Sequence, residues 1–321
     1  MDVPPLPNLD DVLRAAERIR PHAHRTPVLT CAAIDALTGA SLYFKCENLQ
    51  KVGAFKFRGA TNAVMSLSDD AARRGVATHS SGNHAAALAL AARNRGITAH
   101  VVMPSSAPAV KKAAVTGYGA RIVECEPTLE ARETTLEAVV AETGAAFIHP
   151  YNDPRVVAGA GTAALELLTA HPDLDVIMAP VGGGGLMSGT AIASRGLSDR
   201  IRIIGAEPEL ADDAQRSLEA GAIIPSINPR TICDGLLTSL GPLSFTVLSS
   251  HLECIVTVSE GAIVRAMRHV WERMKIIIEP SSAVPLAVLL EDRIDLKGLR
   301  VGVIVSGGNV NLDQLPWSIP R

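Results

Sequence analysis

Short apolar runs alternate with longer alanine-rich or amphipathic stretches along most of the chain, which predicts alternating strands and helices. A first series has expected strands at residues 75–79, 98–103, 120–125 and 145–149, and expected helices at 84–95, 108–117 and 128–143. A second series has expected helices at 159–171, 186–194, 258–274 and 281–291, and expected strands at 176–181, 201–206 and 299–305. This rhythm is typical of parallel sheets covered by helices, so we expect an α/β protein.

Two such series in 321 residues favour two open α/β domains with mostly parallel, twisted sheets. The stretch before residue 62 adds a predicted strand at 42–46, which we expect to pack with the second series. We therefore predict a discontinuous large domain, residues 1–66 and 152–321, and a small mobile domain, residues 67–151.

Composition narrows the class of protein. Aromatic residues make up 3% of the chain and hydrophobic residues 47%, so the core must consist of Ala, Val, Leu and Ile. The formal net charge is −3 with no basic run, so we expect no nucleic-acid partner. No apolar stretch reaches about 18 residues, and the first residues lack an export signal, so we expect no membrane span. Five scattered cysteines without C-x-x-C indicate reduced thiols in the cytoplasm.

The strongest local feature is a run of four glycines, residues 182–185, between a buried strand and a predicted helix. Glycines let the backbone approach an anion, and the helix start offers free N–H groups and a positive dipole end. No Gly-Lys-Ser/Thr follows, so this is not a Walker A loop, and the last glycine of G-x-G-x-x-G is missing. The loop therefore predicts a site for a single phosphate monoester; the alternative is a flexible turn.

Lys56 is the candidate reactive residue. It stands between Phe55 and Phe57 in a segment flanked by glycines. Desolvation between two rings would lower the pKa of the amine and leave it nucleophilic, able to form a Schiff base with a carbonyl group. The alternative is an ordinary solvated lysine.

Two further polar loops follow expected strands. Residues 78–84 read Thr-His-Ser-Ser-Gly-Asn-His, and Ser80 and Ser81 would either bind a ligand or cap the next helix. Ser306 ends the strand expected at 299–305, and it is either a ligand contact or a cap or turn residue.

These motifs, in this order, resemble those of fold-type II pyridoxal phosphate (PLP) enzymes. They are Gly-Ala-Phe-Lys-Phe-Arg-Gly-Ala around Lys56, Ser-Gly-Asn-His at 81–84, the tetraglycine loop, and Ser-Gly-Gly-Asn at 306–309. The chain is most similar to the serine racemase and serine/threonine dehydratase (ammonia-lyase) family, from about residue 8 to about residue 315. The resemblance implies a fold like that of the tryptophan synthase beta chain, PLP as cofactor, and a homodimer.

The resemblance also implies roles at the cofactor. Lys56 would carry PLP as a Schiff base, Phe55 would stack on its ring, and Asn83 would hydrogen-bond the ring hydroxyl. Ser306 would face the pyridine nitrogen and leave it largely unprotonated, which favours elimination over transamination. The phosphate would be held by the backbone N–H groups of Gly182, Gly183, Gly184, Gly185 and Leu186.

At the substrate, the resemblance implies that Ser80, Ser81 and His84 hold the carboxylate. Ser81 would also lie opposite the lysine, where racemases exchange a proton; the alternative is that it only binds the carboxylate. Arg132 would pair with the second carboxylate of a β-hydroxyaspartate, or else be an exposed helix arginine. Thr238 stands where racemases often have serine, and its methyl group would narrow the pocket.

An acidic loop at residues 204–213 follows an expected strand, and its ordinary interpretation is a solvated turn. The resemblance implies instead a divalent cation site formed by Glu207, the Ala211 carbonyl and Asp213. Such hard oxygen donors suit Mg²⁺, Ca²⁺ or Mn²⁺.

The resemblance therefore implies a PLP-dependent ammonia-lyase (dehydratase), a carbon–oxygen lyase. It would remove water from a small amino acid, namely L-serine, L-threonine or β-hydroxyaspartate, to give a 2-oxo acid and ammonia. A serine or aspartate racemase, alone or bifunctional with the dehydratase, is the alternative, and a non-catalytic PLP-binding or nucleotide-binding protein is a third. We expect no regulatory domain after Arg321, which favours a catabolic role.

Overall fold

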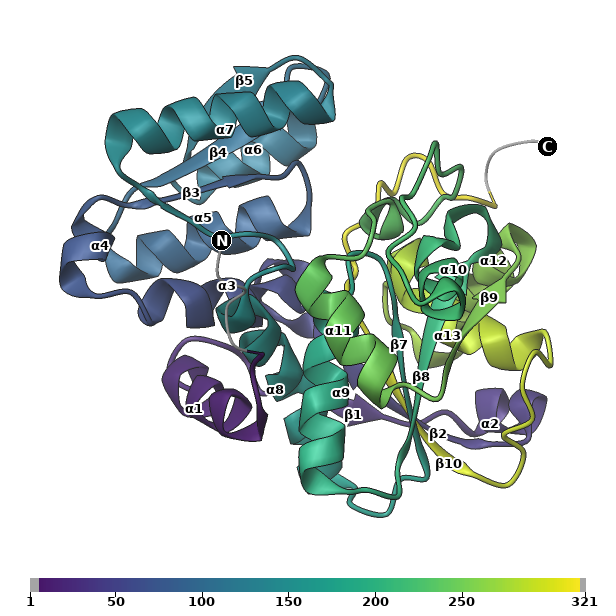
Figure 1. Ribbon diagram of the computed structural model, residues 1–321. Helices are drawn as coiled ribbons and strands as arrows, with labels where there is room; N and C mark the ends of the chain where they lie inside the picture. Colours follow the sequence, from purple (N-terminus) through teal and green to yellow (C-terminus); the bar gives the residue numbers. More distant parts are fainter. Residues whose placement is uncertain (1–5, 318–321) are drawn as a thin grey trace.

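Figure 1 shows the computed structural model, which describes residues 6–317 and has two lobes. The first residues, on which the prediction of no export signal rests, lie outside the described residues, as do the two outer ends of the predicted large domain. No helix within 6–317 is long and apolar enough to cross a membrane.

The larger lobe is built on a six-stranded sheet in the order β1-β2-β10-β7-β8-β9. All neighbours in this sheet are parallel except β1 and β2. Its strands are β1 (Val28–Leu29), β2 (Ser41–Cys46), β7 (Val176–Pro180), β8 (Arg202–Pro208), β9 (Cys254–Val258) and β10 (Arg300–Val305). The strand predicted before residue 62 therefore does join the second series, because β2 pairs with β10 along its whole length.

The smaller lobe is built on a four-stranded, all-parallel sheet in the order β5-β4-β3-β6. Its strands are β3 (Val76–His79), β4 (Ala99–Pro104), β5 (Arg121–Cys125) and β6 (Ala146–Phe147). β6 is shorter than the strand predicted at 145–149, because only Ala146 and Phe147 pair with β3.

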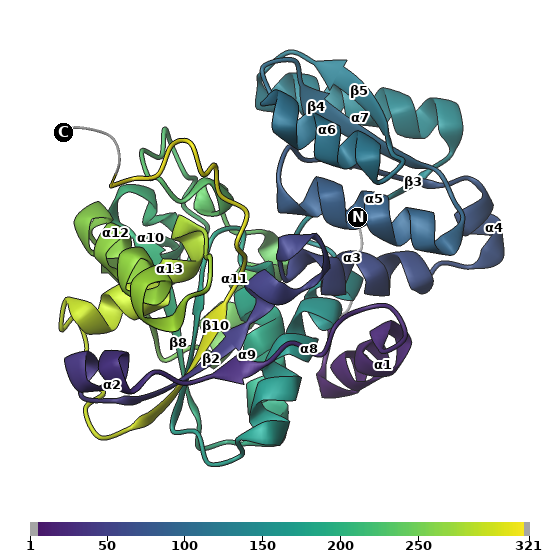
Figure 2. The same ribbon diagram turned by 180° about the vertical axis from the view of Figure 1, so that it is seen from behind.

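Helices flank both sheets (Figures 1 and 2). In the first half of the chain they are α1 (Leu9–Ile19), α2 (Ala32–Thr38), α3 (Lys56–Met65), α4 (Asp69–Arg73), α5 (Asn83–Arg95), α6 (Ala109–Gly117) and α7 (Leu129–Thr143). In the second half they are α8 (Pro154–Ala170), α9 (Gly185–Leu197), α10 (Asp213–Ala220), α11 (Pro242–His251), α12 (Glu260–His269) and α13 (Pro280–Leu290). Short turns are η1 (Glu47–Leu49), η2 (Lys51–Gly53), η3 (Glu209–Ala211), η4 (Asp234–Leu236) and the π-helical η5 (Val270–Met274).

Each sheet is covered on both faces. In the larger lobe, α12 and α13 pack on one face and α8, α9 and α11 on the other, which gives two separate apolar clusters. In the smaller lobe, α3 and α5 pack on one face and α7 on the other. This arrangement confirms the predicted α/β class with mostly parallel sheets; the domain boundaries and the mobility of the smaller lobe remain predictions.

The helix predicted at 258–274 is confirmed from Glu260 onward, as α12 followed by η5, but the sequence analysis missed the strand before it. The β-branched run Cys254–Val258 pairs with β8 as the edge strand β9. Ser259 then caps α12 through its side chain, which accepts from the Ala262 N–H. The helix changes to π-type at Val270. An apolar run of five residues serves a strand or a helix equally well, and the vacant sheet edge decides here.

A buried ion cluster joins α3 to the larger lobe. The guanidinium of Arg58, which is fully buried, donates to both oxygens of Glu47 at 2.7 and 2.8 Å and to both oxygens of Glu166 at 2.8 and 2.9 Å. Lys45 donates to Glu166 at 2.5 Å and to the Thr26 carbonyl at 2.7 Å. Two cations thus face two anions, which balances the charge inside the protein.

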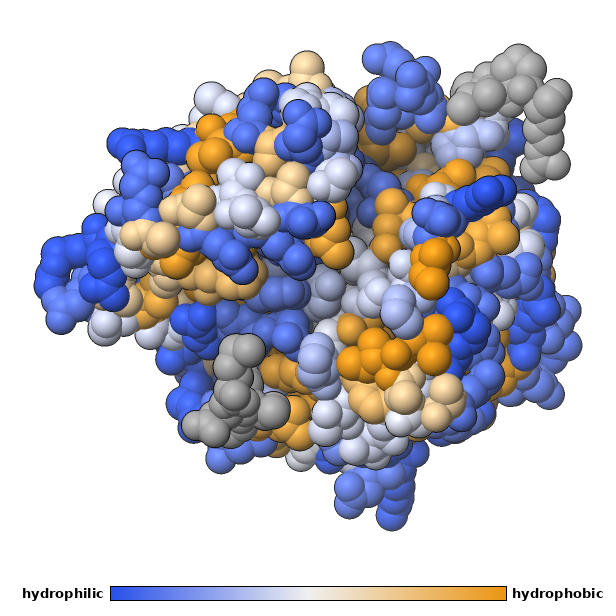
Figure 3. Space-filling model, turned by 45° about the horizontal axis from the view of Figure 1, so that its top comes forward, coloured by the Kyte–Doolittle hydropathy of each residue, from blue (hydrophilic) through white to orange (hydrophobic). Residues whose placement is uncertain are grey.

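The two lobes meet along a furrow that is visible on the molecular surface in Figure 3. Contacts cross this furrow from both sides. Asn83 of the smaller lobe donates to Glu279 of the larger lobe at 3.2 Å, and Lys111 donates to Asp234 at 2.8 Å. A hydrogen bond and an ion pair therefore connect the two lobes across the junction.

Candidate active site

The carboxyl ends of two neighbouring parallel strands, β7 and β10, carry two of the predicted loops. In the larger sheet, the chain continues from β7 to β8 and β9 on one side, and then returns to form β10 on the other side of β7. Open α/β sheets bind ligands at such a reversal of strand order, beyond the carboxyl ends of the strands. The glycine loop follows β7 and Ser306 follows β10, so both predicted loops lie at this position.

The tetraglycine loop has no room for side chains. A Cβ atom on Gly183 would lie 2.5 Å from the Tyr151 ring, and one on Gly184 would lie 2.5 Å from the Ser244 Cβ. Gly184 also has a φ of +85° and is the N-cap of α9, which disfavours any other residue. Among the described residues, the backbone N–H groups of 182–184 have no hydrogen-bond acceptor. Buried N–H groups without acceptors, next to a helix start, fit an anion such as a phosphate.

Lys56 is the first residue of α3. Its position is fixed because the two residues before it pair with the backbone after β10. The Phe55 N–H donates to the Ser306 carbonyl at 2.9 Å, and Ala54 bridges to Gly307. The Lys56 amine donates to the carbonyl of Pro150 at 2.9 Å. Burial lowers the pKa of Lys56 to about 8, although the nearby Glu279 opposes the shift. A substantial neutral fraction near pH 8 makes this amine a nucleophile and a base.

The prediction that two aromatic rings enclose Lys56 is wrong in one respect. The amine lies 5.1 Å from the centroid of the Phe55 ring, as expected. Phe57 instead points into the apolar core of the smaller lobe, where its ring lies 5.8 Å from the Lys51 amine. Both residues are neighbours of Lys56 in sequence, but successive side chains of a helix point about 100° apart.

Glu279 is a site residue that the sequence analysis missed. Its carboxylate accepts from the Asn83 side chain at 3.2 Å on each oxygen and from the Asn309 N–H at 3.2 Å. Burial raises the pKa of Glu279 to about 7, against the hydrogen bond from Asn83. The available signal was a single acid at the end of an apolar run, just before Pro280 at the start of α13.

Ser306 is buried at 3% exposure and lies 3.0 Å, oxygen to oxygen, from the hydroxyl of Ser282. Ser282 also receives the Gly307 N–H at 2.7 Å. These bonds fix Ser306 at the end of β10. Its predicted role there is to face the pyridine nitrogen of the cofactor.

The loop before α5 and the first turn of that helix hold three predicted substrate contacts, Ser80, Ser81 and His84. The capping alternative for Ser80 and Ser81 is wrong, because Gly82 is the N-cap of α5 and no side chain caps that helix. Ser80 instead accepts from the Gly82 N–H at 3.3 Å, and Ser81 is half-buried. His84 is 2% exposed, and its Nε2 donates to the Ile148 carbonyl at 3.2 Å. Burial and the nearby Lys56 lower the pKa of His84 to about 3, so a substrate contact through its side chain would be neutral.

Arg132 and Thr238 approach the junction from opposite lobes. The Nε of Arg132 is buried with no hydrogen-bond partner in the described part of the chain, and its charge reaches His79 at the end of β3. Thr238 is exposed on the segment after η4 and lies near Tyr151, and burial raises the pKa of Tyr151. Tyr151, which also packs on the glycine loop, is a second residue that the sequence analysis did not find.

The predicted cation residues lie together at the end of β8. Glu207 accepts from the N–H groups of Ala214 and Gln215 at 3.0 and 2.8 Å, and both oxygens of Asp213 are buried without a partner. Burial raises the pKa of Glu207 to about 8 and that of Asp213 to about 6. No group of three or more His, Cys, Asp or Glu side chains within 6–317 could hold a metal ion. A cation here would therefore need the Ala211 carbonyl and water as further ligands.

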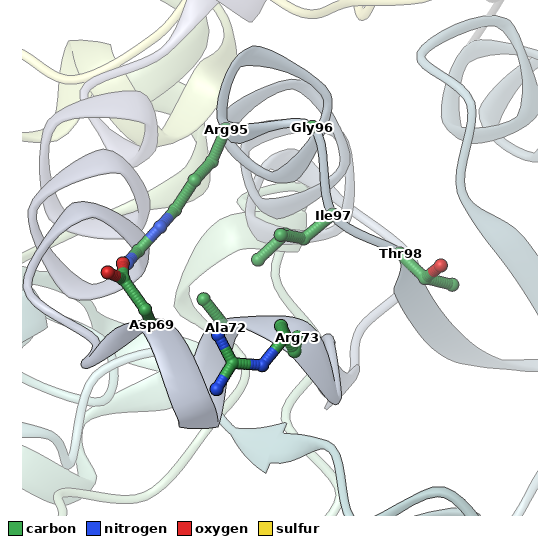
Figure 4. Close-up of a pocket in the computed structure, with 7 residues that line it drawn as sticks. All are labelled: Asp69, Ala72, Arg73, Arg95, Gly96, Ile97 and Thr98. Atoms are coloured by element: carbon green, nitrogen blue, oxygen red, sulfur yellow. The ribbon is translucent and has the colours of Figure 1, made fainter.

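A pocket of about 470 Å³ on the smaller lobe is unrelated to this site (Figure 4). It lies at the amino end of β4, whereas Ser80 and Ser81 follow the carboxyl end of its parallel neighbour β3, so the two sites lie at opposite ends of the strands. Its residues are Asp69, Ala72, Arg73, Arg95, Gly96, Ile97 and Thr98. Arg95 donates to the carbonyls of Val64 and Leu67, so its guanidinium has a structural role.

The fold and the site thus define an α/β protein with a low-pKa lysine beside a phosphate-type glycine loop. The chain matches the pyridoxal-phosphate dependent enzyme family over residues 19–307 and belongs to that family. It is therefore a PLP enzyme of fold-type II, as the motif order implied.

Individual relatives agree in fold and size. The chain is 53% identical to beta-hydroxyaspartate dehydratase of Paracoccus denitrificans, covering 98% of this chain and 99% of the relative. It is 48% identical to serine racemase of Dictyostelium discoideum, covering 96% of each. The solved structure of maize serine racemase superposes with a TM-score of 0.95 at 45% identity, covering 98% of this chain and 97% of the other.

Lys56 should react as a low-pKa amine in the cofactor-free protein. Trace acetylation followed by peptide mass spectrometry should give half-maximal reactivity of Lys56 near pH 8. Glu279→Gln should move this midpoint to lower pH, because Glu279 raises the pKa of Lys56. Glu253→Gln, which alters an exposed pair with Arg202, serves as the control. A midpoint near the ordinary lysine value of about 10.4, or no movement in Glu279→Gln, would contradict the assignment.

Proposed function

We propose that this protein is an ammonia-lyase that eliminates water from a β-hydroxy amino acid, with β-hydroxyaspartate as its preferred substrate. The products would be a 2-oxo acid and ammonia. The observation that carries the proposal is the buried amine of Lys56, with its pKa lowered to about 8, between a glycine loop and a strand end. The 53% identity to a beta-hydroxyaspartate dehydratase supports the choice of substrate.

The described residues fit PLP. The unpaired N–H groups of Gly182, Gly183 and Gly184, followed by those of Gly185 and Leu186 in the first turn of α9, would hold the phosphate. Lys56 would bind the cofactor covalently and Phe55 would lie against its ring. Asn83 would reach the ring hydroxyl and Ser306 the ring nitrogen.

When bound, PLP supplies an electron sink for the α-carbon of the substrate. The Lys56 amine, which the substrate amine would displace from the cofactor, would then remove the α-proton. The β-hydroxyl would leave with the electron pair of its carbon–oxygen bond and take up that proton, as water. The aminoacrylate released would hydrolyse to the 2-oxo acid and ammonia. Ser80, Ser81 and the N–H groups of their loop, together with the backbone N–H of His84, would hold the α-carboxylate. Closure of the smaller lobe, residues 67–151, would exclude water.

Arg132 would select a substrate with a second carboxylate. A guanidinium pairs with a carboxylate through two parallel hydrogen bonds, and the buried Nε of Arg132 has no partner within 6–317. Thr238, beside Tyr151, would limit the space for other side chains.

A substrate panel tests this specificity. The protein loaded with PLP should form oxaloacetate from erythro- or threo-β-hydroxyaspartate faster than it forms oxo acids from L-serine or L-threonine. Arg132→Leu should lower kcat/KM for hydroxyaspartate by about 10- to 100-fold, since a charged hydrogen bond contributes about 1.5–3 kcal/mol, and spare L-serine.

Arg121→Leu, an exposed arginine on β5, is the matched control and should leave both substrates unchanged. Equal losses on hydroxyaspartate and serine in Arg132→Leu would contradict the role of Arg132. Full activity of Lys56→Ala would contradict the mechanism.

Racemisation is the second candidate activity. Ser81 would stand on the face of the substrate opposite Lys56, where it could return a proton to the α-carbon. The 48% identity to a serine racemase supports this alternative.

Substitution of Ser81 tests the racemase activity directly. Ser81→Ala should abolish formation of D-serine from L-serine while retaining elimination, whereas Ser80→Ala should retain both. Chiral chromatography and an oxo-acid assay measure the two products. If Ser81→Ala loses both activities equally, the two-face assignment fails, and oxo acid without any D-serine from the wild type rejects the racemase.

We also propose a divalent cation at Glu207, Asp213 and the Ala211 carbonyl. Two buried carboxylates, one of them without any hydrogen-bond partner in the described chain, are costly in apolar surroundings, and a cation would offset that cost. The ion would be structural or activating, because the glycine loop already serves the phosphate.

Removal of the cation should destabilise the protein. Mg²⁺, Ca²⁺ or Mn²⁺ at a concentration about a hundredfold above its Kd should stabilise the folded protein by about 2.7 kcal/mol. This stabilisation should raise Tm by about 5 °C relative to protein in EDTA. Asp213→Asn should remove this difference, and Asp212→Asn, which alters an exposed pair with Arg216, should keep it. A Tm that is the same in EDTA and in all three cations would reject the site.

The remaining expectations follow the family resemblance. We propose that the protein is a homodimer in the cytoplasm, and that residues 1–66 with 152–321 form the PLP-binding domain.

A further inference from the structure

The segment that links the two lobes contacts the reactive lysine. Residues 148–152 lead from β6 of the smaller lobe to α8 of the larger lobe. Ile148 is still tied to the smaller sheet, because its N–H donates to the Ala77 carbonyl at 2.9 Å. Two residues later, the carbonyl of Pro150 accepts a hydrogen bond from the amine of Lys56 at 2.9 Å. The crossover between the lobes thus provides the hydrogen-bond acceptor of the lysine.

The side chain of His149 closes this crossover into a turn. Its Nδ1 accepts from the N–H of Tyr151 at 3.2 Å and from the N–H of Asn152 at 2.9 Å. Nδ1 must therefore be unprotonated, with the proton of the neutral ring on Nε2. Burial, with His79 and Lys56 nearby, lowers the pKa of His149 to about 4, so this acceptor persists at neutral pH.

The turn is held from two further sides. The Tyr151 ring lies against the glycine loop, where a Cβ atom on Gly183 would come within 2.5 Å of it. The Asn152 side chain accepts from the N–H of Leu243 at 3.1 Å, at the start of α11. Pro150 itself has a fixed φ and no N–H. The direction of the Pro150 carbonyl is consequently determined by the turn that His149 closes.

We propose that His149 is a positioning residue that aims the Pro150 carbonyl at Lys56 and so holds the lysine amine whenever it is not bonded to the cofactor. This inference rests on the proposed role of Lys56. A lysine side chain has four rotatable bonds, and a buried amine requires an acceptor. Without the carbonyl in place, the amine would sample other orientations, and a misplacement of about 1 Å can reduce a rate by about 100-fold.

Two substitutions separate the acceptor from the bulk of the ring. His149→Asn places an oxygen where Nδ1 stands, the same number of bonds from the backbone, and can accept both N–H groups. His149→Leu fills similar space without an acceptor. His100→Leu, a half-buried histidine on β4, is the matched control.

The direct measurement is cofactor loading. Cofactor-free protein is mixed with PLP, and formation of the bond to the lysine is followed by absorbance over a range of PLP concentrations. In His149→Leu, the first-order rate constant at saturating PLP should fall by about 10- to 100-fold. The PLP concentration giving half-maximal rate should stay within about twofold, because the phosphate site is unchanged. His149→Asn and His100→Leu should match the wild type within about threefold.

Steady-state kinetics on β-hydroxyaspartate give a second readout, in which His149→Leu should lower kcat more than it raises KM. A wild-type loading rate in His149→Leu, or a rate in His149→Asn as slow as in His149→Leu, would overturn the inference. His149→Ala replaces His149→Leu if the latter does not fold. If PLP forms no bond to Lys56 in the wild-type protein, the proposed function is overturned, and this inference with it. If the wild type loads PLP normally and His149→Leu loads it at the same rate, only this inference is overturned.

Discussion

The burial of Arg58 is the constraint on which the site depends. This guanidinium, two residues after Lys56, lies fully buried between the carboxylates of Glu47 and Glu166, so it fixes the start of α3 against the larger lobe. Burial alone would lower the pKa of Arg58, but the two carboxylates outweigh it and raise the pKa. Removing one partner from such a cluster costs about 3–5 kcal/mol, because the remaining charge is left uncompensated. Lys56 can therefore keep a partly neutral amine while a permanent charge nearby anchors its helix.

The chemistry follows from where the chain places free hydrogen-bonding groups. At the reversal of strand order between β7 and β10, the glycine loop offers N–H groups without acceptors, and Lys56 offers an amine that burial keeps close to neutrality. Asn83 and Glu279 join the lobes at the same point, and the charge of Glu279 also raises the pKa of Lys56. Membership of the PLP-dependent family gives these groups a cofactor with a phosphate and a carbonyl.

Much of this could be predicted from the sequence, because the decisive features are local. Periodicity revealed the parallel strands, and glycine content and motif order revealed the loop and the lysine. Predictions that depended on packing were less successful. Phe57 turns away from Lys56 because a helix begins there. The strand β9 was missed, because it forms by pairing with an open edge of the sheet. Glu279 was missed because its contacts are with residues far away in sequence. His149 was missed because its own contacts are local, and only the fold brings the neighbouring Pro150 carbonyl to Lys56.

Trapping the cofactor on the protein tests the central claim most directly. Protein loaded with PLP is reduced with borohydride, digested, and its lysine-containing peptides are analysed by mass spectrometry. The account predicts a single phosphopyridoxyl group, on Lys56. Modification of a different lysine, such as Lys51 or Lys45, or a protein that carries no such group after loading, would contradict it.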